Sequence, residues 1–496
     1  MRELEWKAVV EEGFELRPDR LVVPGGTLSA RRTSPIHDEY FDTDDLRLAR
    51  WGVTVRWRDG EGWTVKLPRQ RPLSGSVLDR SELHIEGDPE SVPDEVAALV
   101  APFARHQVLH DVAQLETMRT TWTWTSTDGV VVGELVDDHV AGRGRNGDRR
   151  FREIEFELGP GGDPDTMAVI VESLGLADPR PAVPKLVRLL GDEASAPPDV
   201  VRIELPKQPT AADVIHAAIA ASVQRLITQI PAARLGVDPE GVHQARVATR
   251  RLRSDLRTFA PLLDKEWARE LRRELSWLAD ELGAVRDSDV LQLHLAAALA
   301  ANPEIDQARG ADILGRLAAE NVRKRDVLVG HLADERAITL YDHCVQVAND
   351  PRLRKRARKR VASQVLPPLM KSSWRALRSE VRGLSDPPAE VELHELRILA
   401  KRVRYAAEAV APAVGKKARK FASSAAAIQD VLGELHDSVV AAEWLELAAA
   451  TDLDAAGAFA AGRLAQQLRS HAIASATEWR DSYDAMRRRT DWMKVD

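Results

Sequence analysis

Polar and apolar residues alternate along most of the first 190 residues, in runs such as 52–58 and 152–158. A period of two is that of a β-strand with one buried face. Turn signals rich in Gly, Asp and Pro separate the runs, and helical periodicity appears only near 91–104 and 164–175. This part of the chain therefore predicts a mostly antiparallel β domain.

From about residue 210 the apolar positions recur at i, i+3, i+4 and i+7, which is typical of packed helices. A repeat lies within this region. The pattern H-x-x-R-x-x-x-(R/K)-R-x-R begins at His243 and again at His394, and a Leu-Gly-x-x-(Arg/His)-Asp segment follows at Leu282 and at Leu432. A duplicated helical bundle is the simplest interpretation.

An Asp-Pro pair precedes each copy of the repeat, at Asp238-Pro239 and at Asp386-Pro387. Aspartate is a favoured N-cap residue, and proline is favoured at the first helical position. We therefore expect a helix to begin at each pair.

The composition narrows the class of protein. A chain of 496 residues with 44% hydrophobic and 30% charged residues is typical of a folded protein of two or three domains. The longest apolar run, near 293–301, is far shorter than a membrane span, and the N-terminus lacks the apolar stretch of a secretory signal. We therefore expect a cytoplasmic protein without a membrane partner. The single cysteine, Cys344, excludes an intrachain disulfide and a cysteine-rich metal site.

The net charge of −7 conceals two oppositely charged parts. Residues 1–200 hold 24 lysines and arginines against 37 acidic residues, whereas residues 201–496 hold 46 against 40. Opposite signs in the two parts predict two modules with different partners.

Charged residues of both signs share single faces of the predicted strands. One face carries Glu3, Glu5 and Lys7, another Arg56 and Arg58, and a third Glu153, Glu155 and Glu157. The simpler interpretation is a sheet with one solvated side. The alternative is the wall of a closed barrel, in which carboxylates hold a divalent cation and basic groups hold phosphate oxygens.

The ordered set of these residues resembles the CYTH superfamily, the triphosphate tunnel metalloenzymes. The E-x-E-x-K pattern of Glu3 to Lys7 begins the set, which continues with Tyr40-Phe41-Asp42-Thr43, Arg56-x-Arg58, Lys66, Arg80-x-Glu82, Arg119, an Asp137-Asp138 turn, Glu153-x-Glu155-x-Glu157 and Lys185. The resemblance implies an eight-stranded antiparallel β tunnel that acts on triphosphate substrates with Mg²⁺ or Mn²⁺.

The resemblance also implies roles for these residues. The expected catalytic residues are Glu3, Glu5 and Lys7, the expected metal ligands are Glu3, Glu5, Glu82, Glu153 and Glu155, and the expected substrate-binding residues are Arg56, Arg58, Lys66, Arg119 and Lys185. Glu157 is either a further site residue or an outer-rim residue. The expected reaction is phosphoanhydride hydrolysis, in which a metal polarises the phosphoryl group and cations neutralise its oxygens.

In the helical part, a basic stripe borders the apolar stripe in each copy of the repeat. These segments resemble the CHAD domain, in which two four-helix bundles bind inorganic polyphosphate. The resemblance implies polyphosphate contacts by His243, Arg246, Arg250, Arg253, His394, Arg397, Lys401 and Arg404, with Arg251 and Arg402 as second candidates. A row of cations along a polyanion predicts strong, salt-sensitive binding.

Together, the two resemblances predict a two-domain α+β protein. An eight-stranded antiparallel β tunnel with helices is expected over residues 1–195, a linker over 196–209, and duplicated four-helix bundles over 210–490. The two repeats are expected at about 210–350 and 351–490.

Three functions follow from these features. The first is a metal-dependent triphosphatase whose helical domain binds polyphosphate. The second is a non-catalytic polyphosphate-binding protein that localises to polyphosphate granules. The third, a nucleic-acid binder, ranks last because the sequence contains no recognisable base-reading or stacking motif.

Overall fold

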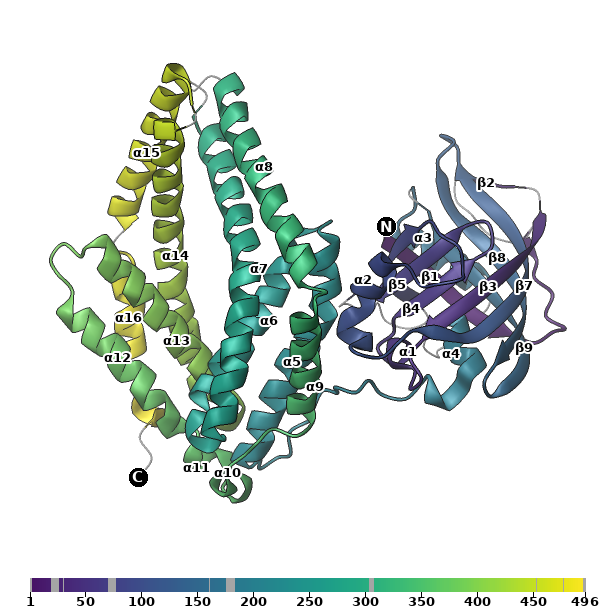
Figure 1. The fold of residues 1–496 in the computed structure, drawn as a ribbon, viewed down its shortest axis with the longest axis horizontal. Coiled ribbons are helices and arrows are strands. Elements are labelled where there is room, and N and C mark those ends of the chain that lie inside the picture. The colour runs from purple at the N-terminus through teal and green to yellow at the C-terminus, as the bar shows by residue number, and fades with distance from the viewer. Residues whose placement is uncertain are drawn as a thin grey trace. The chain divides into compact units, whose positions relative to one another are not determined.

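The computed structural model divides into two compact units, Met1–Asp199 and Val200–Asp496, and each is described by itself (Figure 1). The structure describes residues 2–18, 26–29, 31–69, 77–159, 161–174, 183–302, 307–451, 453–475 and 477–493. Among these, the side chains of residues 2, 3, 77, 164, 166, 307–309, 474 and 475 are not described.

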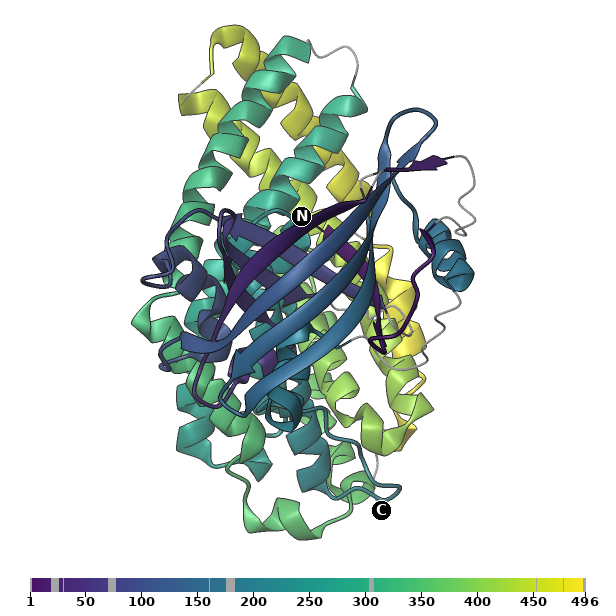
Figure 2. The same cartoon turned by 90° about the vertical axis from the view of Figure 1, so that its right-hand side faces the viewer.

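The first unit is a closed antiparallel β barrel (Figure 2). Its strands are β1 (Arg2–Val10), β2 (Gly26–Leu28), β3 (Arg32–Asp42), β4 (Thr54–Arg58), β5 (Gly62–Pro68), β6 (Val77–Ile85), β7 (His110–Ser126), β8 (Val131–Gly144) and β9 (Gly147–Leu158). Eight strands form a ring in the order β7-β3-β4-β5-β6-β1-β9-β8, which the pairing of β7 with β8 closes, and β2 adds to β7. The predicted eight-stranded barrel is confirmed, so one face of each strand is internal rather than open to solvent.

Helices cover the outer face of the barrel. They include α1 (Arg47–Arg50), α2 (Asp94–Ala104) and α3 (Pro164–Ser173). Leu4 and Trp6 of β1 share one hydrophobic cluster with Met167 and Ile170 of α3. Because the apolar residues of β1 face this outer cluster, the alternating Glu5 and Lys7 face the interior.

The short helix α4 (Lys185–Leu190) packs against one end of the barrel. Its three leucines cluster with Leu115 of β7 and Val140 of β8, which share the strand parity of the inward-facing Arg119 and Asp138. Two glycines of β8 leave room for this contact, because a Cβ at Gly142 or Gly144 would lie 2.9 Å from a leucine methyl of α4. The helix therefore closes this end, with Lys185 at its start.

The second unit is helical and duplicated. Its helices are α5 (Ala211–Leu235), α6 (Pro239–Thr258), α7 (Lys265–Ala300), α8 (Gln307–His331), α9 (Glu335–Asn349), α10 (Lys355–Lys359), α11 (Ala362–Val365), α12 (Met370–Gly383), α13 (Glu390–Val414), α14 (Lys416–Thr451), α15 (Ala455–Ser475) and α16 (Trp479–Arg487). The four helices α5–α8 correspond to α12–α15, and the third helix of each set, α7 or α14, has 36 residues. This arrangement agrees with the predicted pair of four-helix bundles.

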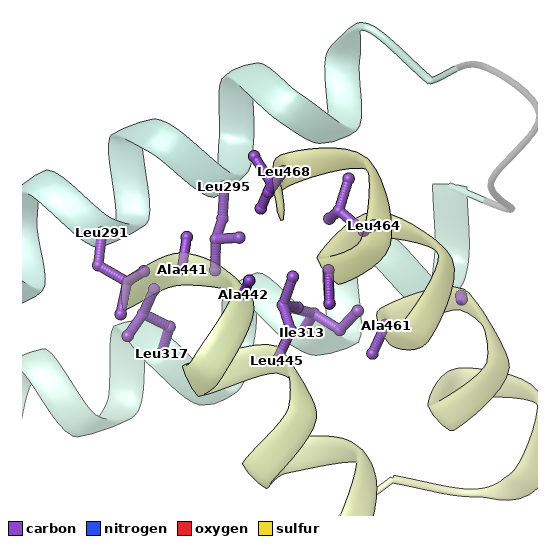
Figure 3. Packing of buried hydrophobic residues seen from close by; sticks show 12 residues of the cluster. Leu291, Leu295, Ile313, Leu317, Ala441, Ala442, Leu445, Ala461, Leu464 and Leu468 are labelled. Atoms are coloured by element: carbon purple, nitrogen blue, oxygen red, sulfur yellow. The ribbon is translucent and has the colours of Figure 1, made fainter. Parts of the chain in front are cut away.

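The two helical repeats pack against each other through equivalent helices, α6 with α13 and α7 with α14. One hydrophobic cluster includes residues from both repeats (Figure 3). Leu295 of α7 and Leu317 of α8 pack there with Leu445 of α14 and Leu464 of α15. The basic stripes on α6 and α13 are therefore carried by helices that contact each other.

The two Asp-Pro pairs behave differently. Asp238 is the N-cap of α6, and its side chain accepts a hydrogen bond from the Glu240 N–H at 2.8 Å, as expected. The expectation for Asp386 is wrong, because α13 begins only at Glu390. The Glu392 carboxylate instead accepts a hydrogen bond from the Ala389 N–H at 2.7 Å and caps this helix from within.

Candidate functional site

The barrel encloses a highly charged cavity of about 290 Å³. Seven lysine and arginine side chains and six carboxylates line it. The lining includes nine residues that the sequence places at the site: Glu5, Lys7, Arg56, Arg58, Lys66, Glu82, Arg119, Glu155 and Lys185. The alternation along the strands thus brings together charges that lie up to 180 positions apart in the sequence.

Lys7 lies between carboxylates from two adjacent strands. It stands opposite Glu155 in the pairing of β1 with β9. The Lys7 Nζ lies 2.8 Å from Glu5 Oε1 and 3.0 Å from Glu155 Oε1. Burial opposes the charge on Lys7, but Glu155 and Glu5 raise the pKa of the ammonium group above its ordinary value. Lys7 therefore stays protonated and holds the two carboxylates together.

A second ammonium group, from Lys185 of α4, reaches the same region. Its Nζ lies 2.8 Å from Asp138 Oδ2 and contacts Glu155 Oε1. Arg119 donates hydrogen bonds to Asp138 at 2.9 and 2.7 Å and to Glu155 at 3.2 Å. Burial opposes ionisation of Glu155, but Lys185, Lys7 and Arg119 hold its pKa well below the usual range.

Glu153, two residues away on β9, has a different environment. It is fully buried and does not line the cavity described above. Its Oε1 accepts a hydrogen bond from Arg188 of α4 at 2.7 Å, whereas its buried Oε2 has no hydrogen-bond partner and lies 3.6 Å from the Lys185 Nζ. Burial raises the pKa of Glu153, against the opposing effect of Lys185 and Lys7, and the nearby Glu155 charge adds to the rise. The two glutamates thus have opposite protonation preferences.

The opposite wall of the cavity is built from β3 to β6. Arg58 donates hydrogen bonds of 2.7 and 3.2 Å to both oxygens of Asp38, and Arg56 lies 3.7 Å from the same carboxylate. The Lys66 Nζ lies 3.3 Å from Glu82 Oε1. Burial opposes ionisation of Asp38 and Glu82, but these cations lower the pKa of both carboxylates. Each of these three cations on this wall thus lies close to a carboxylate.

Some sequence expectations need qualification. The Glu3 side chain lies outside the described part of the structure, although its backbone pairs with Arg80 in β1 and β6. Glu157, which the sequence left as either a site residue or an outer-rim residue, lines the cavity. The expected turn at Asp137-Asp138 is wrong, because both residues lie within β8 and pair with β9. Long strands are needed there to close the barrel through both β7 and β9.

Sequence reasoning gave no role to several charged residues at this site. Asp38 pairs with the two arginines of β4, Asp138 pairs with Lys185, and Arg80 donates a 2.7 Å hydrogen bond to Glu5. Arg188 holds Glu153. Asp38, Asp138 and Arg80 could have been predicted, because their strand parity places them on the inner face with the recognised residues. Arg188 could not, because its contact depends on where α4 packs.

In the helical unit, the basic stripes of the two repeats face each other. Lys401 of α13 is surrounded by Arg397 on its own helix and by Arg250 and Arg246 on α6. Burial and these three guanidinium groups lower the pKa of Lys401 to about 7. Among the described residues, no carboxylate forms an ion pair with Lys401 or Arg250. These four residues, Arg246, Arg250, Arg397 and Lys401, are called the central cluster below.

Two carboxylates lie at the edge of the central cluster. The Asp287 Oδ1 lies 3.1 Å from Arg246, and the equivalent Asp437 Oδ1 lies 3.8 Å from Arg397. Each pairs with an arginine of its own repeat, and neither forms an ion pair with Arg250 or Lys401.

The other expected anion contacts lie around the central cluster. His243 is near Arg286, Arg250 and Arg246, and burial together with these cations lowers its pKa. The Nδ1 atoms of His394 and His436 lie 3.3 Å apart. Arg253 donates a hydrogen bond to the Ser276 hydroxyl at 3.0 Å, and Arg404 pairs with Glu408 at 2.9 Å. Arg253 and Arg404 therefore have side-chain hydrogen-bond partners outside the central cluster.

Two family profiles match this chain in sequence order. The CYTH domain profile matches residues 1–178, and the CHAD domain profile matches residues 217–446. Over 471 residues, the chain is 30% identical to the uncharacterized protein Rv2226 of Mycobacterium tuberculosis, covering 88% of this chain and 86% of that protein. The chain belongs to the CYTH–CHAD family.

Other relatives match one part of this CYTH–CHAD protein. Human thiamine-triphosphatase is 31% identical over 133 residues, which cover 24% of this chain and 53% of that enzyme. The crystal structure of the CHAD domain from the plant Ricinus communis covers 59% of this chain and 95% of its own, with 27% identity and a TM-score of 0.44. The barrel unit of the CYTH–CHAD protein thus has a triphosphatase-type fold.

CYTH domains depend on a metal ion, typically Mg²⁺ or Mn²⁺, and the barrel contains oxygen donors that could bind one. Carboxylates from β1 and β9 converge on the Lys7 ammonium group, and Glu153 Oε2 is buried without a hydrogen-bond partner. Oxygen donors of this kind suit a hard divalent cation. In the described ranges no three acidic, histidine or cysteine side chains are yet grouped at metal-binding distance. The carboxylate oxygens thus suit a divalent cation by their chemistry, and in this structure Lys7 and Lys185 pair with Glu5 and Glu155 in its place.

None of the described helices of this CYTH–CHAD protein combines the length and apolar character needed to cross a membrane.

Proposed function

We propose that the barrel hydrolyses inorganic triphosphate or a related triphosphate with Mg²⁺ or Mn²⁺. The observation that carries this proposal is the enclosed cavity in which Glu5, Lys7, Glu155 and Lys185 converge. Cavities near 300 Å³ suit small ligands. The alternation of cations and carboxylates suits a polyanion that arrives with a divalent metal.

The basic residues bind and orient the phosphate groups. Arg56 and Arg58 on one wall and Arg119 on another direct N–H donors into the cavity, where arginine forks suit phosphate oxygens. Lys66, Lys7 and Lys185 add point charges that stabilise the negative charge on the phosphoryl oxygens during transfer.

The acidic residues hold the metal. Glu5, Glu153 and Glu155 are the proposed ligands, together with Glu3 and Glu82. A bound divalent ion supplies Lewis acidity toward the phosphoryl oxygen and lowers the pKa of bound water. Because Lys7 and Lys185 now pair with the same carboxylates, we expect both ammonium groups to turn to the phosphate oxygens when substrate and metal are present.

The test is phosphate release by the full chain from tripolyphosphate, long-chain polyphosphate, ATP and thiamine triphosphate with Mg²⁺ or Mn²⁺. Glu5→Gln should lower turnover by about 100-fold or more, the scale of a lost electrostatic group. Glu11→Gln, an exposed carboxylate just after β1, is the control and should match the wild type. Normal turnover by Glu5→Gln would contradict the assigned site.

We further propose that the helical unit binds inorganic polyphosphate through the central cluster. Its uncompensated cations, and especially the half-buried Lys401, support an anionic ligand, because unpaired cations crowded together repel each other. Arg250→Ala with Lys401→Ala should lower polyphosphate affinity by about 100-fold, as expected for two charge-assisted contacts.

The phosphate-release and polyphosphate-binding assays also distinguish the triphosphatase from the alternative functions. Polyphosphate affinity that depends on the central cluster, without phosphate release from any tested substrate, would indicate a non-catalytic protein that localises to polyphosphate granules. Effective competition by DNA or RNA would instead favour a nucleic-acid binder.

A further inference from the structure

The charge surroundings of the central cluster differ between the two repeats. Equivalent residues of the repeats lie 151 positions apart, as His243 and His394 do. By this offset Arg253 corresponds to Arg404, whereas Arg257 corresponds to the acidic Glu408. The pseudo-symmetry of the backbone is therefore broken by a reversal of charge at one position.

On the α13 side, Arg404 and Arg251 next to the central cluster are paired with carboxylates. Arg404 donates a hydrogen bond of 2.9 Å to Glu408, and Arg251 contacts the other oxygen of that carboxylate. Arg251 also lies 3.4 Å from Asp255, which is fully buried. These groups line a cavity of about 690 Å³ between α5, α6, α13 and α14, together with Arg225 of α5 and Arg250 of the central cluster. Glu408 thus pairs with both Arg404 and Arg251, whereas burial raises the pKa of Asp255 to about 7 and this carboxylate offsets less of the positive charge.

On the α6 side, the equivalent surroundings are entirely cationic. The charged groups that act on Arg257 are Arg272, Arg402 and Arg253, and burial and these guanidinium groups lower its pKa. The Arg272 Nε is buried and has no hydrogen-bond partner, while Arg253 donates to the neutral Ser276 hydroxyl. In the described parts of the chain, none of these four arginines forms an ion pair. They are called the lateral cluster: Arg253, Arg257, Arg272 and Arg402.

The lateral cluster continues the central cluster along one helix face. Arg246, Arg250, Arg253 and Arg257 follow each other at spacings of three or four residues on α6. The row from Arg246 to Arg257 is about 16 Å long at the rise of an α-helix. An extended polyanion can therefore contact both clusters without leaving this face.

We propose that a polyphosphate chain held at the central cluster continues onto the lateral cluster and not into the cavity beside Glu408, where Arg251 and Arg404 already pair with that carboxylate. This inference rests on the proposed polyphosphate binding and deepens it, because it assigns one direction to the chain, selects Arg402 over Arg251, and adds two further contacts, Arg257 and Arg272. Crowded arginines without counter-charges gain from an anionic ligand, whereas Arg251 and Arg404 already have one. Long chains reach the lateral cluster, and short chains fill only the central cluster.

The test compares short-chain with long-chain polyphosphate in binding titrations of the full protein. Arg257→Gln with Arg272→Gln should lower long-chain affinity by about tenfold and reduce the slope of log affinity against log salt by about 1.4, or 0.7 per lost contact. Short-chain affinity should change less than about twofold. The matched control, Lys416→Gln with Lys417→Gln, removes two exposed charges at the start of α14 and should change neither.

Because the variant removes mutually repelling charges, its melting temperature should not fall, which separates lost contacts from misfolding. Unchanged long-chain affinity, or equal losses for both chain lengths, would overturn the proposed direction of the chain but not the proposed binding by the central cluster. Wild-type protein that binds neither chain length would overturn the proposed polyphosphate binding as well.

Discussion

At the scale of single residues, burial and neighbouring charges decide which ionisable groups are available for a ligand. Carboxylates raise the pKa of Lys7 and Lys185 in the barrel cavity and hold both protonated, whereas Lys401 is surrounded by guanidinium groups. Its pKa of about 7 places its charge change near neutral pH. Lys401 is thus the residue whose titration should be most visible in binding.

A bound polyanion favours the charged form of Lys401, so polyphosphate affinity should fall as the pH rises through about 7 toward about 9, by about tenfold. Lys401→Arg should remove most of this dependence, because arginine remains charged throughout. Titrations with long-chain polyphosphate at several pH values measure this. An equal pH dependence in Lys401→Arg would contradict the role of Lys401.

The same group affects folding with the opposite sign. The lowered pKa means that the unfolded chain binds more protons than the folded chain between about pH 7 and about pH 10. The free energy of unfolding of the helical unit should therefore rise with pH in that window. Urea unfolding measures this change, and Lys401→Met should flatten it. A wild-type profile that falls over the window would contradict the stated environment.

Much of the residue-level site was predictable from the sequence. The parity of Glu5, Lys7, Arg56 and Glu155 along their strands is enough to place them on the inner face of the barrel. The partners of these residues were not predictable. Asp138, for example, was expected in a turn, because a local Asp-Asp pair resembles turn chemistry and barrel closure is a long-range property.

At the scale of elements, the position of α4 is determined by residues far away in sequence. Gly142 of β8 faces Leu189 of α4 so closely that a Cβ would lie 2.9 Å from its nearest methyl. Because α4 carries Lys185, the packing of this helix also positions a charge in the cavity. Periodicity along a six-residue segment does not show where such a helix docks.

Gly142→Val should displace α4 and destabilise the barrel unit by about 1–3 kcal/mol, the usual cost of overpacking. It should also weaken tripolyphosphate binding, because Lys185 moves with the helix. Thermal unfolding and binding titration measure the two effects. Gly129→Val, at a turn where a Cβ meets no neighbour, controls for the loss of glycine, although its positive φ adds a backbone cost. Binding unchanged by Gly142→Val would contradict the positioning role of α4.

The starts of α6 and α13 offer a comparison within one chain. Asp238→Ala should lower the free energy of unfolding by about 1 kcal/mol, because it removes the N-cap hydrogen bond of α6. Asp386→Ala should change it by less than about 0.5 kcal/mol, since this residue is outside the cap of α13. Urea unfolding of both variants is the measurement, and equal losses would contradict the assigned helix starts.

At the scale of the whole molecule, each unit has its own hydrophobic core, and each core supports its own set of charged residues. The barrel clusters contain only residues of the first unit, and the shared cluster of α7, α8, α14 and α15 contains only residues of the second. Residues 1–199 and 200–496 produced separately should therefore each unfold cooperatively in calorimetry. Failure of either to fold alone would contradict this division.

The fold class and the duplication were predictable because period two, period 3.6 and a repeated motif are local signals. The asymmetry of the repeats was not, because Glu408 gains its meaning only through contacts with Arg404 and with Arg251 of the other repeat. Similarly, the closure of one barrel end requires the contact of α4 with two β8 glycines.

The central claim is that charges on the inner wall of the barrel hold a triphosphate. Its most direct test is the equilibrium binding of tripolyphosphate with Mn²⁺, measured calorimetrically in full-length protein that carries Arg250→Ala and Lys401→Ala, so that the barrel alone reports. Adding Lys66→Met should weaken binding by about tenfold or more, the value of one charge-assisted contact. Adding Arg150→Met, on the outer face of β9, should leave it unchanged. Equal affinities for the two variants would contradict the account.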